Sequence, residues 1–207
     1  MRINRRQTAG LLLLVTVTFL AGCASVRDGG FARPAAAPLP DVDADLKPGL
    51  AVLYFPKRFV RHVDMLPHGE DALEKGVPGP PVTNLNRRFG RGQVFQSGTN
   101  RGIGVEMSGF VLLANPGRYQ FRVNSNDGFR LHMDGRLLLE DPAWHASGDQ
   151  MTAPAAFDVA EPAWYSLRIR YFQRKGTAAF QFFWQPPGAS DFTPVPGRVL
   201  AHREPYR

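Results

Sequence analysis

The sequence NPGRYQFRVNSNDGFRLHMDG, from Asn115 to Gly135, decides the fold of this chain. Apolar and polar side chains alternate in residues 119–123 and again in residues 129–133, which is the pattern of strands with one buried face. Turn-forming residues lie between these strands, at 125–128, and after the second strand, at 134–135. The stretch therefore predicts consecutive β-strands rather than helices.

Three further segments extend the pattern in both directions. Residues 104–111 (GVEMSGFV), 164–172 (WYSLRIRYF) and 180–188 (FQFFWQPPG) have the composition of strands, and residues 50–55 form a candidate first strand. In order and spacing, these segments resemble the PA14 domain, a module of bacterial toxins, glycosidases and adhesins. The resemblance covers residues 49–201 and implies an all-β fold, an antiparallel β-sandwich.

The N-terminus has the features of a secretory signal. Three arginines precede an apolar run at residues 11–20, which is too short to span a membrane. Residues 20–23, LAGC, resemble the bacterial lipobox, whose cysteine is acylated, and Cys23 is the only cysteine in the chain. We predict a signal peptide over residues 1–22 and a palmitate-type lipid anchor on Cys23, with a buried core thiol as the alternative. The resemblance also implies the outer membrane rather than the inner one, because Ala24 stands where an aspartate often marks inner-membrane retention in related lipoproteins.

Residues 23–48 are rich in Ala, Pro, Gly and Asp, which predicts a flexible tether before the folded part, and residues 202–207 form a predicted tail. Removing residues 1–22 leaves 22 basic against 18 acidic residues, a net charge of +4. No basic run interleaved with aromatic residues is present. We therefore expect attachment to a membrane through the lipid and no nucleic-acid partner.

Residues 56–93 are rich in Pro, Gly, Arg and His, and two interpretations stay open for them. They form either an insertion that covers a binding face or long loops. Solvated loops are the simplest interpretation of their basic character, and contact with anionic lipid or polysaccharide is the alternative. The arginines concerned are Arg58, Arg61, Arg87, Arg88 and Arg91.

Motifs for catalysis are weak in this chain. Gly98, Gly102 and Gly104 have the spacing of a dehydrogenase nucleotide loop, but residues 105–113 continue as a strand where such a loop must open a helix. Neither a G-x-S-x-G elbow nor an H-E-x-x-H motif occurs, and the alternation around His132 predicts a surface histidine. The sequence therefore predicts a protein that is not an enzyme.

Asn126-Asp127-Gly128 stands where the PA14 family usually has two aspartates before a glycine. In the calcium-dependent lectins of that family, two aspartates joined by a cis peptide bond hold a calcium ion, which in turn binds sugar hydroxyls. The resemblance implies a similar site at this position. Asn126 and Asp127 are thus the candidate calcium ligands, with an amide oxygen replacing the first carboxylate. The alternative is a simple hairpin turn, because Asn, Asp and Gly accept positive φ.

The loop at residues 141–147 is the expected second wall of this site. Trp144 is a candidate for stacking on a pyranose ring, with core packing as the alternative, and His145 lies beside it. The candidate ligand-binding residues are Asn126, Asp127, Gly128, Trp144 and His145.

Two functions follow. The first is a lipoprotein that binds polysaccharide or peptidoglycan, and it predicts that Asp127→Ala weakens glycan retention and leaves the fold intact. The second is a structural or assembly lipoprotein that binds another envelope protein.

Overall fold

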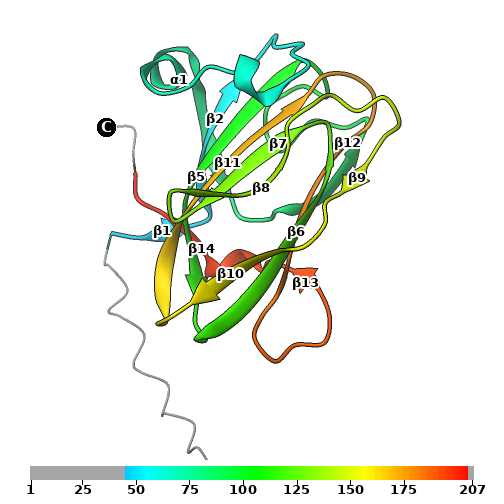
Figure 1. Ribbon diagram of the computed structural model, residues 1–207. Coiled ribbons are helices and arrows are strands. Elements are labelled where there is room, and N and C mark those ends of the chain that lie inside the picture. The colour runs from blue at the N-terminus through cyan, green and yellow to red at the C-terminus, as the bar shows by residue number, and fades with distance from the viewer. Residues whose placement is uncertain (1–44, 205–207) are drawn as a thin grey trace, which may run out of the picture. The chain divides into compact units, whose positions relative to one another are not determined.

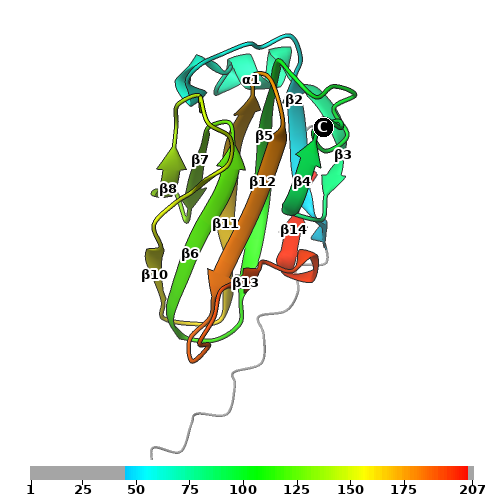
Figure 2. The same ribbon diagram turned by 90° about the vertical axis from the view of Figure 1, so that its right-hand side faces the viewer.

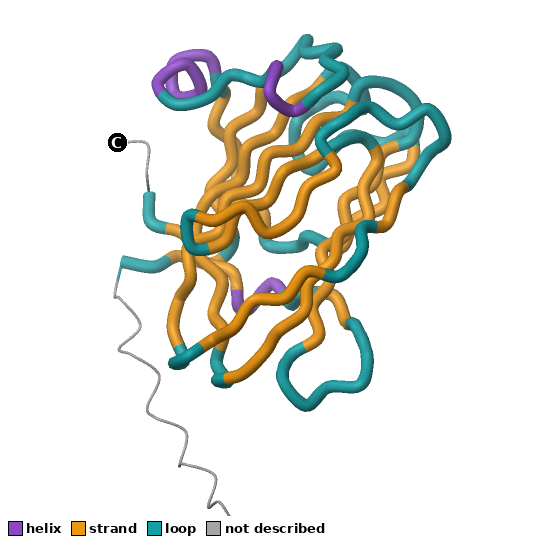
Figure 3. Tube along the Cα trace, in the orientation of Figure 1, coloured by secondary structure: helices purple, strands orange, loops and turns teal. Residues whose placement is uncertain are grey.

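Two antiparallel β-sheets pack face to face in the computed structural model, which describes residues 45–204 (Figure 1, Figure 2). The predicted signal peptide, Cys23 and residues 24–44 of the predicted tether lie outside the described residues. Strands and connecting loops make up almost all of the described chain (Figure 3). The predicted β-sandwich is confirmed.

The larger sheet has eight strands. Its order is β1-β14-β5-β11-β7-β8, with β2 pairing with β5 and β3 pairing with β2. The strands are β1 (Lys47–Pro48), β2 (Leu50–Phe55), β3 (Val77–Val82), β5 (Ile103–Leu113), β7 (Phe129–Met133), β8 (Arg136–Asp141), β11 (Ala163–Gln173) and β14 (Leu200–His202).

The smaller sheet has six strands. Its order is β10-β6-β12-β13, with β4 pairing with β12 and β9 pairing with β6. The strands are β4 (Asn86–Gly90), β6 (Gly117–Asn126), β9 (Gln150–Met151), β10 (Ala155–Val159), β12 (Ala178–Gln185) and β13 (Thr193–Pro194).

Helical structure is short. A 3₁₀ turn, η1 (Val63–Met65), a helix, α1 (Glu70–Lys75), and a second 3₁₀ turn, η2 (Gly197–Val199), lie between strands. Within residues 45–204, no helix combines the length and apolarity needed to cross a membrane.

The core lies between the sheets and is rich in aromatic side chains. Phe180 of the smaller sheet contacts Tyr171 and Phe129 of the larger sheet, with ring centroids 5.2 and 5.9 Å apart. Phe121 stacks on Phe182 at 5.5 Å. Burying each such side chain contributes about 1.5–3 kcal/mol to stability, so this layer can hold the sheets together without a disulfide.

The polar residues between β6 and β7 do not form a hairpin turn. β6 pairs with β12, β10 and β9, whereas β7 pairs with β11 and β8. Asn126, Asp127 and Gly128 therefore carry the chain from one sheet to the other, and the hairpin alternative is wrong. A hairpin does follow at Asp134-Gly135, where φ is +50° and +71° between β7 and β8.

The sandwich extends beyond both predicted limits. Lys47 pairs with His202, and Pro48 pairs with Ala201, so β1 and β14 close the larger sheet together. His202 is buried, and its Nδ1 lies 2.9 Å from the carbonyl oxygen of Gly49. Pro48 lacks a backbone N–H, and an edge strand tolerates this.

Residues 56–93 contain regular structure as well as loops. Strand β3 pairs with β2, and β4 pairs with β12, so the C-terminal part of this segment extends both sheets. Its N-terminal part, near residues 61–63, pairs instead with residues 142–144, through an isolated bridge between His62 and Ala143. The segment thus flanks the loop that contains Trp144.

Candidate functional site

Four connections meet at the upper end of the sandwich in Figure 2: residues 126–128, 141–149, 174–177 and the segment before α1. Backbone hydrogen bonds join them. The N–H of Trp144 donates to the carbonyl of Arg61 (2.9 Å), and Gly102, just before β5, accepts from Arg58 (2.7 Å) and donates to Arg174 (3.0 Å). The fold therefore assembles the predicted site from residues far apart in the sequence.

Asp127 lies at the centre of these loops and is only 1% exposed. Its Oδ1 accepts a hydrogen bond from the backbone N–H of His145 (3.1 Å), and its Oδ2 accepts one from the N–H of Arg174 (2.8 Å). Burial raises the pKa of the Asp127 carboxyl, although these two amide donors act in the opposite direction. The carboxylate therefore connects three loops, which are the crossover with Asp127, the loop with His145 and the loop with Arg174.

Asn126 is also buried, at 5% exposure. Its Nδ2 donates to Thr177 Oγ1 at 3.4 Å, and its backbone carbonyl accepts a hydrogen bond of 2.5 Å from the Tyr171 hydroxyl. The peptide bond between Asn126 and Asp127 is cis, as the family resemblance implied. The Asn126 side chain thus joins the crossover to the loop before β12.

Gly128 permits a close approach of backbone rather than a positive φ. A Cβ atom at this position would lie 2.5 Å from the carbonyl oxygen of Ala143 and 2.8 Å from that of Asp141. Any side chain would push the loop that contains Trp144 away from the crossover.

His145 contributes its backbone to the site more than its ring. The side chain is 6% exposed, and Nε2 lies 2.9 Å from Asp141 Oδ2. Because the imidazole is covered, contact with a ligand would require a movement of the loop.

Trp144, in contrast, is 38% exposed, and the guanidinium groups of two arginines lie over its ring. Arg61 Cζ lies 5.4 Å from the indole centroid, and Arg174 Cζ lies 5.6 Å from it, both within the range of cation–π attraction. The core-packing alternative for Trp144 does not hold. Arg174 carried no signal in the sequence, since it lies in an ordinary turn between strands and gains its place from the topology.

The side chains at this site supply few of the ligands that a calcium ion requires. Calcium takes six to eight oxygen ligands, whereas the candidate side chains supply one carboxylate, whose two oxygens each accept a backbone amide, and the amide oxygen of Asn126. Within residues 45–204, no group of three or more His, Cys, Asp or Glu side chains is arranged to hold a metal ion. Arg61 and Arg174 add positive charge nearby.

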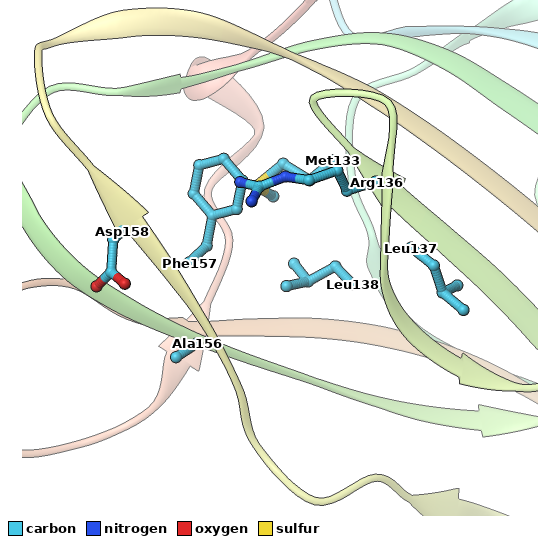
Figure 4. Close-up of a pocket in the computed structure, with 7 residues that line it drawn as sticks. All are labelled: Met133, Arg136, Leu137, Leu138, Ala156, Phe157 and Asp158. Carbon is cyan, nitrogen blue, oxygen red and sulfur yellow. The ribbon is translucent and has the colours of Figure 1, made fainter.

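A cleft of about 250 Å³ opens at another place, between the β7–β8 hairpin and β10 (Figure 4). It adjoins Met133, at the opposite end of β7 from the crossover, and the Arg136 guanidinium lies over the Phe157 ring at 5.2 Å. No residue predicted for the site lies in this cleft.

The outer face of the larger sheet carries a network of ion pairs. Arg168 pairs with Glu106 at 2.8 Å, and Arg130 bridges Glu140 and Asp64. His132 lies on this face, as predicted, and burial lowers its pKa. Because acids balance the arginines, the network is a feature of the sheet surface rather than an open anion site.

The family profile of the PA14 domain matches residues 46–198, which is most of the chain. The chain belongs to the PA14 domain family. A search of curated protein sequences finds no match.

Solved structures with this fold come from several kinds of protein. The PA14 domain of the MpAFP antifreeze protein is 17% identical, with a TM-score of 0.56, and the alignment covers 83% of this chain and 99% of that one. The PA14 sugar-binding domain of an RTX adhesin is 18% identical, with a TM-score of 0.51 and coverage of 75% and 98%. The Epa9 A domain of Candida glabrata, solved with Galβ1-4GlcNAc, is 13% identical, with a TM-score of 0.57 and coverage of 81% and 93%.

Larger proteins share the fold as well. An anti-sigma factor domain-containing protein from Clostridium clariflavum is 21% identical, with a TM-score of 0.58, and the alignment covers 82% of this chain. The match spans only 51% of that protein, and about half of a second protein so described. At these identities the likeness shows the fold alone.

Proposed function

We propose that this protein is a lipoprotein of the bacterial envelope whose PA14 domain binds carbohydrate, either polysaccharide or peptidoglycan, without catalysis. The observation that carries the proposal is the exposed Trp144, which lies within cation–π distance of two arginines and is presented by a loop that the buried Asp127 holds in place. Exposed aromatic rings beside hydrogen-bond donors suit sugar rings, which have apolar faces and polar edges. Support also comes from the sugar-binding domain and the sugar complex among the proteins of this fold.

Binding of the chain from Ala24 to Arg207 to a panel of bacterial glycans and peptidoglycan tests this proposal. We expect retention on at least one glycan and its loss in Trp144→Ala. Leu137→Ala is the control, because Leu137 is 51% exposed and lies in the β7–β8 hairpin, outside the loops around Asp127. Absence of retention on every glycan would contradict the proposal.

Asp127→Ala is a poor test of binding, in contrast to the expectation from the sequence. The carboxylate is buried and accepts two backbone amides, so its removal disturbs three loops at once. A loss of retention in that variant would report damage to the fold as well as to a site.

Anchoring through Cys23 at the outer membrane belongs to the proposal. The expected result is incorporation of labelled palmitate in cells and recovery with outer-membrane fractions, both lost in Cys23→Ser. Recovery of wild-type protein in the soluble periplasm would contradict it.

A second candidate, binding of another envelope protein, has one observation in its favour. Four large apolar side chains between residues 59 and 77 are exposed by 49 to 62%: Phe59, Met65, Leu73 and Val77. Such exposure suits a protein contact if the side chains share one face. Crosslinking in cells at native expression should then capture one specific protein, and Leu73→Glu should abolish the capture.

A further inference from the structure

Arg61 and Arg174 come from distant parts of the sequence and meet at one indole ring. Each is fixed through its backbone: the Arg61 carbonyl accepts a hydrogen bond from the N–H of Trp144 (2.9 Å), and the N–H of Arg174 donates to Asp127 Oδ2 (2.8 Å). The Arg174 carbonyl also accepts from Gly102 (3.0 Å). The backbone positions from which both side chains extend are therefore held by hydrogen bonds.

Neither guanidinium forms an ion pair with an acid of the described chain. Among the described residues, neither guanidinium has a carboxylate within 4.0 Å, whereas Arg88, Arg130 and Arg168 all form ion pairs. The acid beside Arg174 is Asp127, and both oxygens of that buried carboxylate accept backbone amides. The Arg174 Nε is buried and donates to no acceptor in the described chain.

The chemistry of guanidinium groups then defines the ligand. A guanidinium attracted to an aromatic ring retains N–H donors at its edge, and these fit a carboxylate or phosphate with two parallel hydrogen bonds. We propose that this surface binds an acidic glycan, whose carboxylate or phosphate contacts Arg61 and Arg174, and that calcium is not required. The inference rests on the proposed carbohydrate binding and adds the class of sugar.

Trp144 is a positioning residue in this account. Its ring lies within cation–π distance of both guanidinium groups, so its contribution to the acidic preference is to orient the arginines. Trp144→Phe keeps an aromatic face and should retain most of the preference for acidic sugars. Trp144→Leu removes that face and should lose the preference, while the fold is kept.

The test uses the full-length chain in detergent, first with calcium and then with EDTA, and two matched sets of probes. The first set is galacturonate, glucuronate and mannuronate oligosaccharides beside their methyl esters, and the second is phosphomannan oligosaccharides beside their dephosphorylated form. We expect affinity for an acidic probe about tenfold or more above that for its neutral counterpart. Arg61→Gln and Arg174→Gln should each remove most of that ratio.

The control variant is Arg118→Gln, which removes the same charge from an exposed position. Arg118 lies near the start of β6, at the end of that strand away from Asn126. An equal loss in Arg118→Gln would overturn the inference, because it would indicate attraction by overall charge. Equal binding of acidic and neutral probes would overturn the acidic-sugar inference and leave carbohydrate binding standing. Binding that disappears in EDTA would overturn the calcium-free site, and no binding to any probe or glycan would reject both proposals.

Discussion

Asp127-Gly128 and Asp134-Gly135 are the same dipeptide at the two ends of strand β7, yet their environments differ completely. Asp127 is 1% exposed and accepts two backbone amides, whereas Asp134 is exposed and lies in a hairpin turn with φ of +50°. Gly128 lies under the carbonyl oxygens of a crossing loop, and Gly135 has open space around it. The function of a turn-like dipeptide therefore depends on what the topology brings to it, and paired substitutions can test this.

The largest difference is expected between Asp127→Ala and Asp134→Ala. The first leaves two buried amides without an acceptor and should lower the free energy of unfolding by about 2–4 kcal/mol. The second removes an exposed side chain and keeps the hydrogen bond from the Asp134 N–H to Ser166, so the loss should stay below about 1 kcal/mol. Urea unfolding of both variants measures the difference, and equal losses would show that Asp127 does not hold the loops.

Gly128→Ala and Gly135→Ala form the second pair. At position 128 the new methyl group meets backbone oxygens at 2.5 and 2.8 Å, so the loop must move, at a cost of about 2–3 kcal/mol. At position 135 the only cost is the positive φ, about 1 kcal/mol. Thermal unfolding should show a larger loss of stability for Gly128→Ala than for Gly135→Ala. Only Gly128→Ala should also weaken glycan retention. A larger loss for Gly135→Ala would contradict the close approach at Gly128.

The pH dependence of stability sharpens the comparison further. Burial raises the pKa of the Asp127 carboxyl above 3.8 in the folded chain. Just above pH 3.8, this carboxyl is therefore still protonated in the folded chain, whereas in the unfolded chain it has lost its proton. The stability of the wild type relative to Asp127→Ala should therefore fall as pH rises from 3.8 through the folded pKa, and then become constant. Urea titrations between pH 3.5 and pH 6 measure this slope. A difference that rises with pH would mean that the amide donors outweigh burial.

The smallest effect on stability is expected for Trp144→Leu. The ring is 38% exposed, and its contacts with Arg61 and Arg174 contribute about 0.5–1 kcal/mol each at most at such a site. A change in the free energy of unfolding below about 1.5 kcal/mol, with a clear loss of preference for acidic glycans, is the expected combination. A large loss of stability would place Trp144 among the core residues instead.

The sequence predicted the strands well because their signal is local. The alternation in residues 119–123 and 129–133 reports a buried face directly, and the structure has β6 and β7 there. The turn at Asp134-Gly135 was also predicted from a local signal, because Asp and Gly tolerate the positive φ that this hairpin turn requires.

The rest of the site depends on contacts that no local pattern encodes. Nothing near Asp127 indicates that His145 and Arg174 supply its two donors, so the crossover resembled a hairpin. In the sequence, Arg61 is one of several arginines in residues 56–93, and no pattern marks Arg174 as a site residue. Their common neighbour, Trp144, becomes visible only when the two sheets and four loops are in place.

The most direct test of the central claim is to map, by backbone amide chemical shifts, where a bound acidic oligosaccharide lies on the chain. The account predicts that shifted amides cluster in residues 58–62, 143–146 and 173–177, around the two arginines, and that they stay in place when calcium is added. A cluster in residues 133–138 and 156–158, around the cleft of Figure 4, would place the sugar elsewhere and contradict the account.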